Sequence, residues 1–339
     1  MRIGNEVVTP VGIVGLGHMG ASLAGALVGN VGVVGYDLNP ASMDTVAQRF
    51  SITTAESLDD LVRRSQLIVL AVPTPSIEET LDQLDGVAIS LGVRPIVCDI
   101  ASVKSGLVAH EDPPSSLRYV SLHPMAGREG NGAESADPTI FAGANWAVVL
   151  SGQEEPEALA RALMVPLVLG NGVLPIALAE HDRAIAMIST LPHVTAIALG
   201  RLVGQVPDRQ LLRRLAAGSI RDGVRVARTD PMRIVEMFYP NRAQLAGAID
   251  ALVRELEDCR DHLVDEQWLL AWTRAGHEGA CSLDEVGGRN FVLHVSRTML
   301  VSELLRLGAV GAMLVELNAV EGGFVLGLID GQSSRDTTS

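Results

Sequence analysis

Apolar and polar positions divide the chain into a first part in which strands alternate with helices and a second part that is mostly helical. Short apolar runs bounded by turn residues are typical of buried parallel strands. They occupy residues 11–14, 31–36, 67–72, 96–98, 119–122 and 146–150. Helical or loop segments separate these runs, which predicts an α/β fold with a doubly wound sheet.

Beyond residue 152 the apolar residues recur with helical spacing. This spacing predicts helices over 156–168, 181–202, 211–218 and 241–263. Pro192 lacks the N–H that the second of these helices needs, so we expect a kink there that redirects His193. His181, Ile185, Ser189 and His193 recur every fourth residue, and we expect them to share one helix face.

The C-terminal part of the chain is less regular. Its apolar runs predict strand, helix, strand and strand over 291–295, 298–307, 310–317 and 324–329. We therefore expect a sheet domain over residues 1–152, an all-helical domain over 153–264 and a small α+β appendage over 265–330. Residues 331–339 are small and polar, which predicts a disordered tail.

A glycine-rich turn follows the first predicted strand. Its residues, which we assign to cofactor binding, are Gly15, Leu16, Gly17, His18, Met19 and Gly20. A strand, a turn of this spacing and a small-residue helix together form the dinucleotide fingerprint of Rossmann-type domains. Two glycines let the backbone approach a pyrophosphate, and the helix N-terminus attracts that anion. The turn therefore predicts a bound dinucleotide over residues 1–152.

Asp37 ends the second predicted strand, seventeen residues after Gly20. A carboxylate there can accept hydrogen bonds from ribose hydroxyls and would repel a 2′-phosphate. Residues 38–40 supply no cation to receive such a phosphate. We therefore expect NAD rather than NADP, and we expect Val72 and Pro73, where the third strand ends, to border the same cofactor.

Composition and charge limit the class of partner. The net charge of −14 argues against nucleic acid and anionic membranes, whose phosphates most of this surface would repel. No apolar run approaches twenty residues and no signal peptide is indicated, so we expect a cytoplasmic protein without a membrane span. The three cysteines are scattered, and His277 with Cys281 is too small a set for a metal, so we expect neither disulfides nor a metal site.

Two short segments place reactive side chains just beyond the carboxyl ends of predicted strands, where α/β enzymes bind ligands. The first runs over 99–104 and contains Ser102 and Lys104. Lys104 is the one lysine among 26 basic residues, which indicates a task that a guanidinium cannot perform. The second segment, 123–127, begins with His123 and predicts an imidazole at the same sheet edge.

Six segments occur in the order and at the spacing of one enzyme family. They are residues 15–20, 99–104, 123–129, 181–183, 191–193 and 221–225. Through them the chain, over roughly residues 11–263, resembles prephenate dehydrogenase. The nucleotide turn would fit many dehydrogenases, whereas His-Pro-Met-Ala-Gly at 123–127 together with Leu-Pro-His at 191–193 is specific to this family.

The resemblance implies an NAD-linked oxidative decarboxylation of a cyclohexadienyl dicarboxylate, with ring aromatisation, on the route to tyrosine. His123 would accept the proton of the C4 hydroxyl, and Ser102 would hydrogen-bond to that hydroxyl and to the imidazole while lying beside the cofactor. The residues assigned to substrate binding are Arg225, for the ring carboxylate, with His193, Ser189, Lys104 and Arg128. The resemblance further implies a homodimer through the helical domain. The strand, helix, strand and strand expected in the appendage are like the first part of a regulatory ACT module, which some relatives append, but the segment is too short to complete one.

The chain departs from the family pattern at three positions of the expected substrate pocket. Thr190 stands where many relatives have histidine, Val224 where a threonine precedes the arginine, and Ile234 where a tryptophan is common. The substrate therefore stays open among prephenate, arogenate and 4-amino-4-deoxyprephenate. Two other classes also stay open: a dehydrogenase of the β-hydroxyacid or imine reductase kind, which leaves 123–127 unexplained, and a non-catalytic NAD-binding sensor.

Overall fold

The computed structural model describes residues 2–3, 6–7, 10–107, 113–127, 130–283 and 288–331. The chain forms two compact units, a first unit of residues 1–178 with 287–339 and a second unit of residues 179–286. Two expectations lie outside the described residues, namely the role of Arg128 and the disorder of the tail beyond residue 331.

The strands expected from the apolar runs form the centre of the first unit. They are β3 (Val11–Val14), β4 (Val33–Tyr36), β6 (Leu67–Leu70), β7 (Ile96–Asp99), β8 (Arg118–Pro124) and β9 (Trp146–Leu150). Two further strands of this sheet were not expected, β5 (Thr53–Thr54) and β10 (Val173–Ala177). A separate two-stranded hairpin, which was not expected either, consists of β1 (Arg2–Ile3) and β2 (Glu6–Val7).

Helices cover both faces of this sheet because its strands are apolar on both sides. They are α1 (His18–Leu27), α2 (Pro40–Phe50), α3 (Leu58–Arg64), α4 (Ile77–Leu91) and α5 (Pro156–Val168). Buried side chains of α1 and α5 pack on one face, and those of α3 and α4 pack on the other. Short helical turns lie between the strands: η1 (Thr74–Ser76), η3 (Ala133–Ser135) and η4 (Pro138–Phe141).

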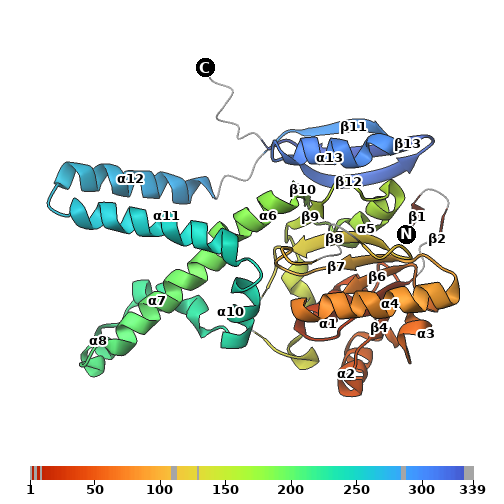
Figure 1. Ribbon diagram of the computed structural model, residues 1–339, viewed down its shortest axis with the longest axis horizontal. Helices are drawn as coiled ribbons and strands as arrows, with labels where there is room; N and C mark the ends of the chain where they lie inside the picture. Colours follow the sequence, from red (N-terminus) through yellow and green to blue (C-terminus); the bar gives the residue numbers. More distant parts are fainter. Residues whose placement is uncertain are drawn as a thin grey trace. The chain divides into compact units, whose positions relative to one another are not determined.

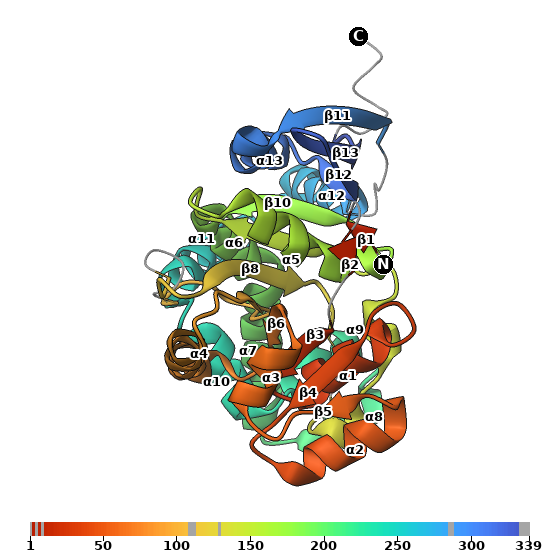
Figure 2. The same cartoon turned by 90° about the vertical axis from the view of Figure 1, so that its right-hand side faces the viewer.

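The C-terminal segment forms strand, helix, strand and strand, as its pattern predicts. The elements are β11 (Asn290–Ser296), η7 (Arg297–Met299), α13 (Leu300–Gly308), β12 (Met313–Val320) and β13 (Gly323–Ile329). They do not form a separate appendage, because β12 pairs antiparallel with β10 and thereby joins the main sheet. The described residues of the first unit contain one sheet of eleven strands, in the order β11-β13-β12-β10-β9-β8-β7-β6-β3-β4-β5 (Figure 2).

Strand direction in this sheet determines where a ligand site can lie. Strands β4, β3, β6, β7 and β8 are mutually parallel, whereas β9 runs antiparallel to β8. The five parallel strands therefore end at the same edge of the sheet, where α/β proteins bind ligands.

The second unit is helical, as expected. Its elements are α6 (Leu178–Ile185), the π-helical turn η5 (Ala186–Thr190), α7 (Leu191–Gln205), α8 (Arg209–Leu215), α9 (Gly218–Gly223), η6 (Arg225–Arg228), α10 (Pro231–Phe238), α11 (Arg242–Asp261) and α12 (Glu266–Ser282). Figure 1 shows α11 and α12 side by side, and the indole N–H of Trp272 joins them by donating to Glu255 at 3.0 Å. The boundary thus differs from the expected one at residue 264, because α12 belongs to this unit.

The helix that runs continuously from Leu178 to Gln205 differs from expectation in two ways. By length and composition alone this helix could cross a membrane, whereas the sequence analysis predicted no membrane-spanning helix. That expectation counted uninterrupted apolar runs, and polar residues such as Ser189 interrupt this one. In addition, Pro192 follows a π-helical turn, which absorbs one extra residue and changes the faces of the residues beyond it.

Candidate functional site

The glycine-rich turn between β3 and α1 has the geometry of a phosphate cradle. Gly15 has a φ of +89°, and a Cβ there would lie 2.8 Å from the carbonyl oxygen of Ala71. A Cβ on Gly20 would lie 1.9 Å from the carbonyl oxygen of Gly15, so only glycine fits. A Cβ on Gly17 would meet no described atom within 4 Å, which leaves open space at the start of α1. An uncapped helix N-terminus facing open space fits a bound pyrophosphate.

The other three residues of the turn point their side chains into the protein. Leu16 is fully buried and Met19 is half-buried. His18 is buried, and its Nδ1 lies 2.9 Å from the hydroxyl oxygen of Ser135 in η3. We therefore expect these residues to serve a cofactor through their backbone rather than through their side chains.

Asp37, directly after β4, lies against the same turn. Its Oδ2 accepts a hydrogen bond from the backbone N–H of Leu16 at 2.6 Å, and its Oδ1 accepts one from Asn39 at 2.8 Å. The carboxylate is half-exposed beside the turn, where it fits ribose hydroxyls. Val72 also borders the turn, because its Cγ1 would lie 3.0 Å from a Cβ on Gly15, and Pro73 follows at the start of η1.

Ser102 and His123 follow neighbouring parallel strands. Asp99 at the end of β7 pairs with Ser121 in β8, so the register places His123 beside the segment that leads to Ser102. His123 is 8% exposed and Ser102 is half-buried. Both lie at the sheet edge that carries the nucleotide turn, because β7 and β8 are parallel to β3 through β6.

Lys104 occupies a different place from the expected one. Its side chain is 0% exposed, and its ammonium lies 2.5 Å from Oδ1 of Asp99 and 2.7 Å from the carbonyl oxygen of Leu122. An ammonium enclosed in this way has no path to a substrate, so we correct the prediction of direct substrate contact. The pattern of basic residues singled out this lysine, but it could not show that the side chain is buried against Asp99 and the Leu122 carbonyl.

Sequence reasoning missed a polar cluster around that lysine. The Asp99 carboxylate is 0% exposed and accepts hydrogen bonds from the hydroxyls of Tyr119 at 2.5 Å and Ser121 at 2.6 Å. Burial alone would raise the pKa of the Asp99 carboxyl, but the Lys104 charge and these donors outweigh it and hold the pKa below its usual value. A signal was present in the sequence, since an aspartate at the end of an apolar strand needs a buried partner.

The second unit brings together the predicted residues on α7 and η6. The Nδ1–H of His193 donates to the backbone carbonyl of Ser189 at 2.9 Å, which leaves its Nε2 as the acceptor nitrogen in the neutral form. The η6 turn that begins with Arg225 packs against α7. Arg225 is exposed, and no described residue bonds to its guanidinium. This unit therefore holds an imidazole and an available guanidinium on adjoining elements.

His181 makes different contacts from His193. His181 is buried, and its Nδ1 lies 2.7 Å from Oδ1 of Asp182. The amide of Asn241 in turn donates to the backbone carbonyl of Asp182 at 2.9 Å, which ties α6 to the start of α11. The π-helical turn η5 lies between His181 and His193 and interrupts the regular α-helical spacing between them.

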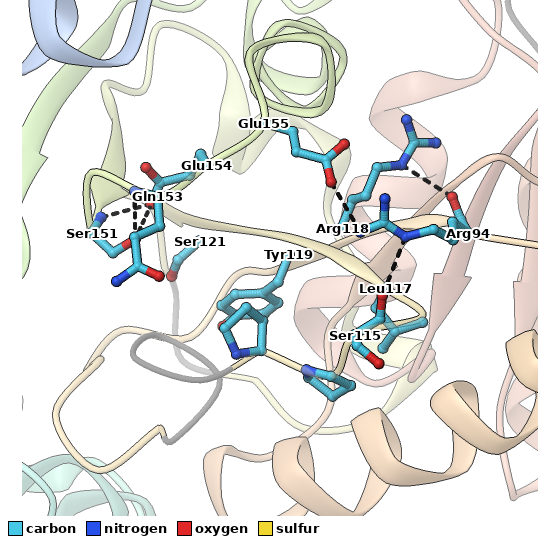
Figure 3. Close-up of a pocket in the computed structure, with 12 residues that line it drawn as sticks. Arg94, Ser115, Leu117, Arg118, Tyr119, Ser121, Ser151, Gln153, Glu154 and Glu155 are labelled. Atoms are coloured by element: carbon cyan, nitrogen blue, oxygen red, sulfur yellow. Dashed lines mark hydrogen bonds and ion pairs between the residues drawn. The ribbon is translucent and has the colours of Figure 1, made fainter.

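A small pocket of about 120 Å³ is lined by none of the predicted site residues (Figure 3). Arg94, just before β7, and Arg118, at the start of β8, line it together with Glu155. The Arg94 guanidinium pairs with Glu155 at 2.9 Å. Since this pocket includes the beginnings of β7 and β8 and none of the predicted site residues, it is not the candidate site.

Comparison with known proteins matches both units in chain order. The family model described as the prephenate dehydrogenase nucleotide-binding domain matches residues 25–172. The model described as the prephenate dehydrogenase dimerization domain matches residues 178–271. Together they span the segments that carry Asp37, Ser102, His123, His193 and Arg225.

Individual relatives show the same likeness over most of their length. The chain is 27% identical to a cyclohexadienyl dehydrogenase of Zymomonas mobilis over 76% of this chain and 89% of that protein. It is similar to Synechocystis arogenate dehydrogenase, with 26% identity, a TM-score of 0.68, and coverage of 81% and 99% of the two chains. It shares the fold of a prephenate dehydrogenase from A. aeolicus in complex with hydroxyphenyl propionate and NAD+, with 24% identity, a TM-score of 0.73, and coverage of 82% and 99%.

The imidazole at the sheet edge and the helical unit with its available guanidinium fall within these matched segments, and the nucleotide turn at residues 15–20 directly precedes the first of them. Two domain models of one family cover most of the chain in the right order. The chain belongs to the prephenate dehydrogenase family.

Proposed function

We propose that this chain catalyses the NAD-dependent oxidative decarboxylation of a cyclohexadienyl dicarboxylate, with His123 and Ser102 acting at C4 and Arg225 binding the ring carboxylate. The family membership supports the reaction class. The observation that carries the assignment of roles is the position of His123, an imidazole at the edge of the sheet whose β3 strand leads into the nucleotide turn.

The residues around the turn fit NAD. Open space at Gly17 admits a pyrophosphate, and the Asp37 carboxylate beside it suits ribose hydroxyls and disfavours a 2′-phosphate. When bound, NAD supplies the acceptor for a hydride. We therefore name Gly15, Gly17 and Asp37 as the residues that hold the cofactor, with Val72 and Pro73 at its border.

His123 acts as the general base in the proposed reaction. Its imidazole takes the proton of the C4 hydroxyl as the C4–H bond breaks with its electron pair, and the C4–O bond becomes a carbonyl. The ring carboxylate then leaves as carbon dioxide, and the electrons of its bond complete the aromatic ring. The proton returns from His123 to the oxygen, so no proton is gained or lost. Ser102 holds the reacting hydroxyl in line by a hydrogen bond.

Residues of the second unit bind the substrate in this proposal. The Arg225 guanidinium can donate two parallel N–H bonds to one carboxylate, a geometry that an ammonium cannot provide. His193 has its Nδ1–H committed to the Ser189 carbonyl, so its Nε2 is the nitrogen offered to a substrate hydroxyl. Ser189 thus contributes through its backbone by fixing the tautomer of His193.

The three departures from the family pattern bear on which substrate is used. Thr190 is fully buried, and its hydroxyl donates to the carbonyl of Ala186 at 3.0 Å inside the π-helical turn. Val224 is half-buried and Ile234 is buried. Thr190 therefore replaces a histidine without offering its own polar group to a ligand.

Turnover with three substrates tests the proposed function. Purified protein is incubated with NAD and with prephenate, arogenate or 4-amino-4-deoxyprephenate, and NADH formation is followed. We expect turnover with at least one of them and not with simple β-hydroxyacids. Absence of NADH with all three, or comparable turnover with β-hydroxyacids, would contradict the proposal.

A homodimer is part of the proposal. The second unit exposes large apolar side chains along its helices: Met187, Ile188, Leu199, Leu202, Val203, Leu211, Leu215, Val253, Leu256 and Leu270. Exposed apolar surface of this extent marks an association site, and this unit matches a dimerization domain. A second copy of the chain would cover these residues, including the apolar helix Leu178–Gln205. We place the enzyme in the cytoplasm, in keeping with its free cysteines.

A further inference from the structure

The one lysine of this chain forms a buried ion pair directly beneath the proposed catalytic residues. Both Lys104 and Asp99 are 0% exposed, and their nitrogen and oxygen lie 2.5 Å apart. Burying two charges costs more than their attraction usually returns, and an apolar pair of the same size is often as stable or more so. Overall stability is therefore a weak explanation for this pair, and its contacts with the backbone provide a better one.

The pair contacts the backbone immediately before His123. The Lys104 ammonium donates to the carbonyl oxygen of Leu122 at 2.7 Å. That carbonyl belongs to the peptide bond that joins Leu122 to His123. The ammonium therefore fixes the peptide plane from which the imidazole projects.

The same pair contacts the backbone immediately before Ser102. Oδ1 of Asp99, which receives the Lys104 ammonium, also accepts the backbone N–H of Ala101 at 2.8 Å. One carboxylate oxygen thus joins the ammonium to the turn that carries Ser102. Through this oxygen the positions of Ser102 and His123 depend on one another.

The second carboxylate oxygen anchors the pair to β8. Oδ2 of Asp99 accepts the hydroxyls of Tyr119 and Ser121, which lie on the same face of the strand as His123 because side chains alternate. Burial and the neighbouring Asp99 charge raise the pKa of Tyr119 well above its ordinary value, so its hydroxyl remains a donor. Figure 3 shows both residues at the wall of the small pocket.

A compact ammonium suits this place better than a guanidinium. It directs tetrahedral N–H bonds to acceptors on two strands within a closed interior, whereas a guanidinium is planar and wider. The chain has 26 lysine and arginine residues, and all of them except Lys104, that is 25, are arginine. The one exception lies in a closed interior, where a compact cation reaches acceptors on two neighbouring strands.

We infer that Lys104 is a positioning residue that, together with Asp99, holds the backbones of Ser102 and His123 in register for proton transfer. This inference rests on the roles proposed above for those two residues. It replaces the expectation that Lys104 contacts substrate, and it assigns the lysine an effect on the rate of the chemical step rather than on substrate binding.

The main test removes both charges together. A single substitution would leave an unpaired buried charge and could unfold the protein, so the variant is Asp99→Asn with Lys104→Met. We expect the double variant to fold, with kcat about 100-fold lower because the imidazole is misplaced. The KM for substrate and the dissociation constant for NAD should change less than about 3-fold, since Arg225 and the Gly15 turn are untouched.

A second variant separates charge from shape. Lys104→Arg keeps the charge and so avoids a bare Asp99, but it cannot reproduce the compact contact with Leu122. We expect kcat to fall with little change in KM. Full activity of Lys104→Arg, or a double variant that keeps kcat while folded, would overturn the inference.

A matched control and a comparison variant complete the experiment. The partly exposed pair Asp60 and Arg64 on α3 lies in the same unit and away from the proposed catalytic residues, so Asp60→Asn with Arg64→Met should keep wild-type kcat. His123→Asn is measured beside them. If His123→Asn keeps its turnover, the proposed function fails; if it loses turnover while the double variant does not, only this inference fails.

Discussion

The position of His123 depends on backbone contacts on both sides of it. Before it, the Leu122 carbonyl accepts the Lys104 ammonium at 2.7 Å. After it, the N–H of Met125 donates to the carbonyl of Asn145 at 2.8 Å. In β8 itself, His123 pairs with Ala147 of β9. An imidazole held in this way can act as a base without rearranging, which is the condition for efficient proton transfer.

Substitution of His123 tests this role at the scale of one residue. His123→Asn keeps a side chain of similar size and polarity but cannot accept and return a proton. We expect kcat to fall by about 10²–10⁴-fold, whereas the dissociation constant for NAD, measured by protein fluorescence, should not change. Wild-type turnover in the variant would remove the proposed role.

The stability of the protein in acid tests the buried pair beneath His123. The pKa of Asp99 lies below its unfolded value of about 3.9, so its contribution to stability is present above that pH and is lost as the pH falls through the folded pKa. Urea unfolding at several pH values should therefore show wild type losing stability, relative to the Asp99→Asn, Lys104→Met variant, only below about pH 4. A difference between the two proteins that is independent of pH would contradict this expectation.

At the scale of elements, local sequence patterns predicted which helices and strands form, but they did not predict which strands pair with one another. The apolar runs predicted β3, β6 and α5 almost to the residue, because buried strands and amphipathic helices leave a periodic record in the sequence. The pairing of β12 with β10 could not be predicted in this way, because strand pairing depends on contacts between residues far apart in the sequence. The π-helical turn before Pro192 also escaped prediction, because its one extra residue alters hydrogen bonding and not composition.

The same distinction applies to the candidate site. The glycine turn and Asp37 could be assigned from spacing alone, and the structure places them in contact. Lys104 could be singled out by its rarity, yet its contact with Leu122 depends on the parallel pairing of β7 with β8, which residue spacing does not predict. The tautomer of His193 likewise follows from a backbone carbonyl one helical turn away.

Close packing at Gly308 tests how α13 holds the C-terminal strands to the main sheet. A Cβ at Gly308 would lie 1.7 Å from the carbonyl oxygen of Pro175 in β10. Gly308→Ala should therefore push α13 away and cost about 1–3 kcal/mol of unfolding free energy, measured by urea unfolding. Gly276→Ala in α12 is the control, because a Cβ there meets no described atom within 4 Å. Equal stability of the two variants would show that α13 is not seated as described.

At the scale of the whole molecule, charge and exposed apolar surface have separate consequences. The net charge of −14 keeps copies of the chain apart except where apolar area outweighs the repulsion. The helices of the second unit supply such area, and the family model for that segment is a dimerization domain. The proposed homodimer is thus attributed to that unit rather than to the sheet.

A charge placed on that helical surface tests the assembly. Leu202 is 61% exposed on α7, and Leu202→Glu would bury a carboxylate in the proposed dimer. We expect wild type to run as a dimer in size-exclusion chromatography with light scattering, and the variant to run as a monomer. Ile89→Glu on α4, 66% exposed in the first unit, should remain dimeric. A wild-type monomer, or a dimer that tolerates Leu202→Glu, would contradict the assignment.

The stoichiometry of the reaction is the most direct test of the central claim, which is that this chain removes a hydride and a carboxylate from one ring. Carbon dioxide and NADH are measured together while the protein turns over its preferred cyclohexadienyl substrate. The account predicts one carbon dioxide for each NADH, with an aromatic product formed at the same rate. NADH formed without carbon dioxide, or carbon dioxide released without NADH, would contradict it.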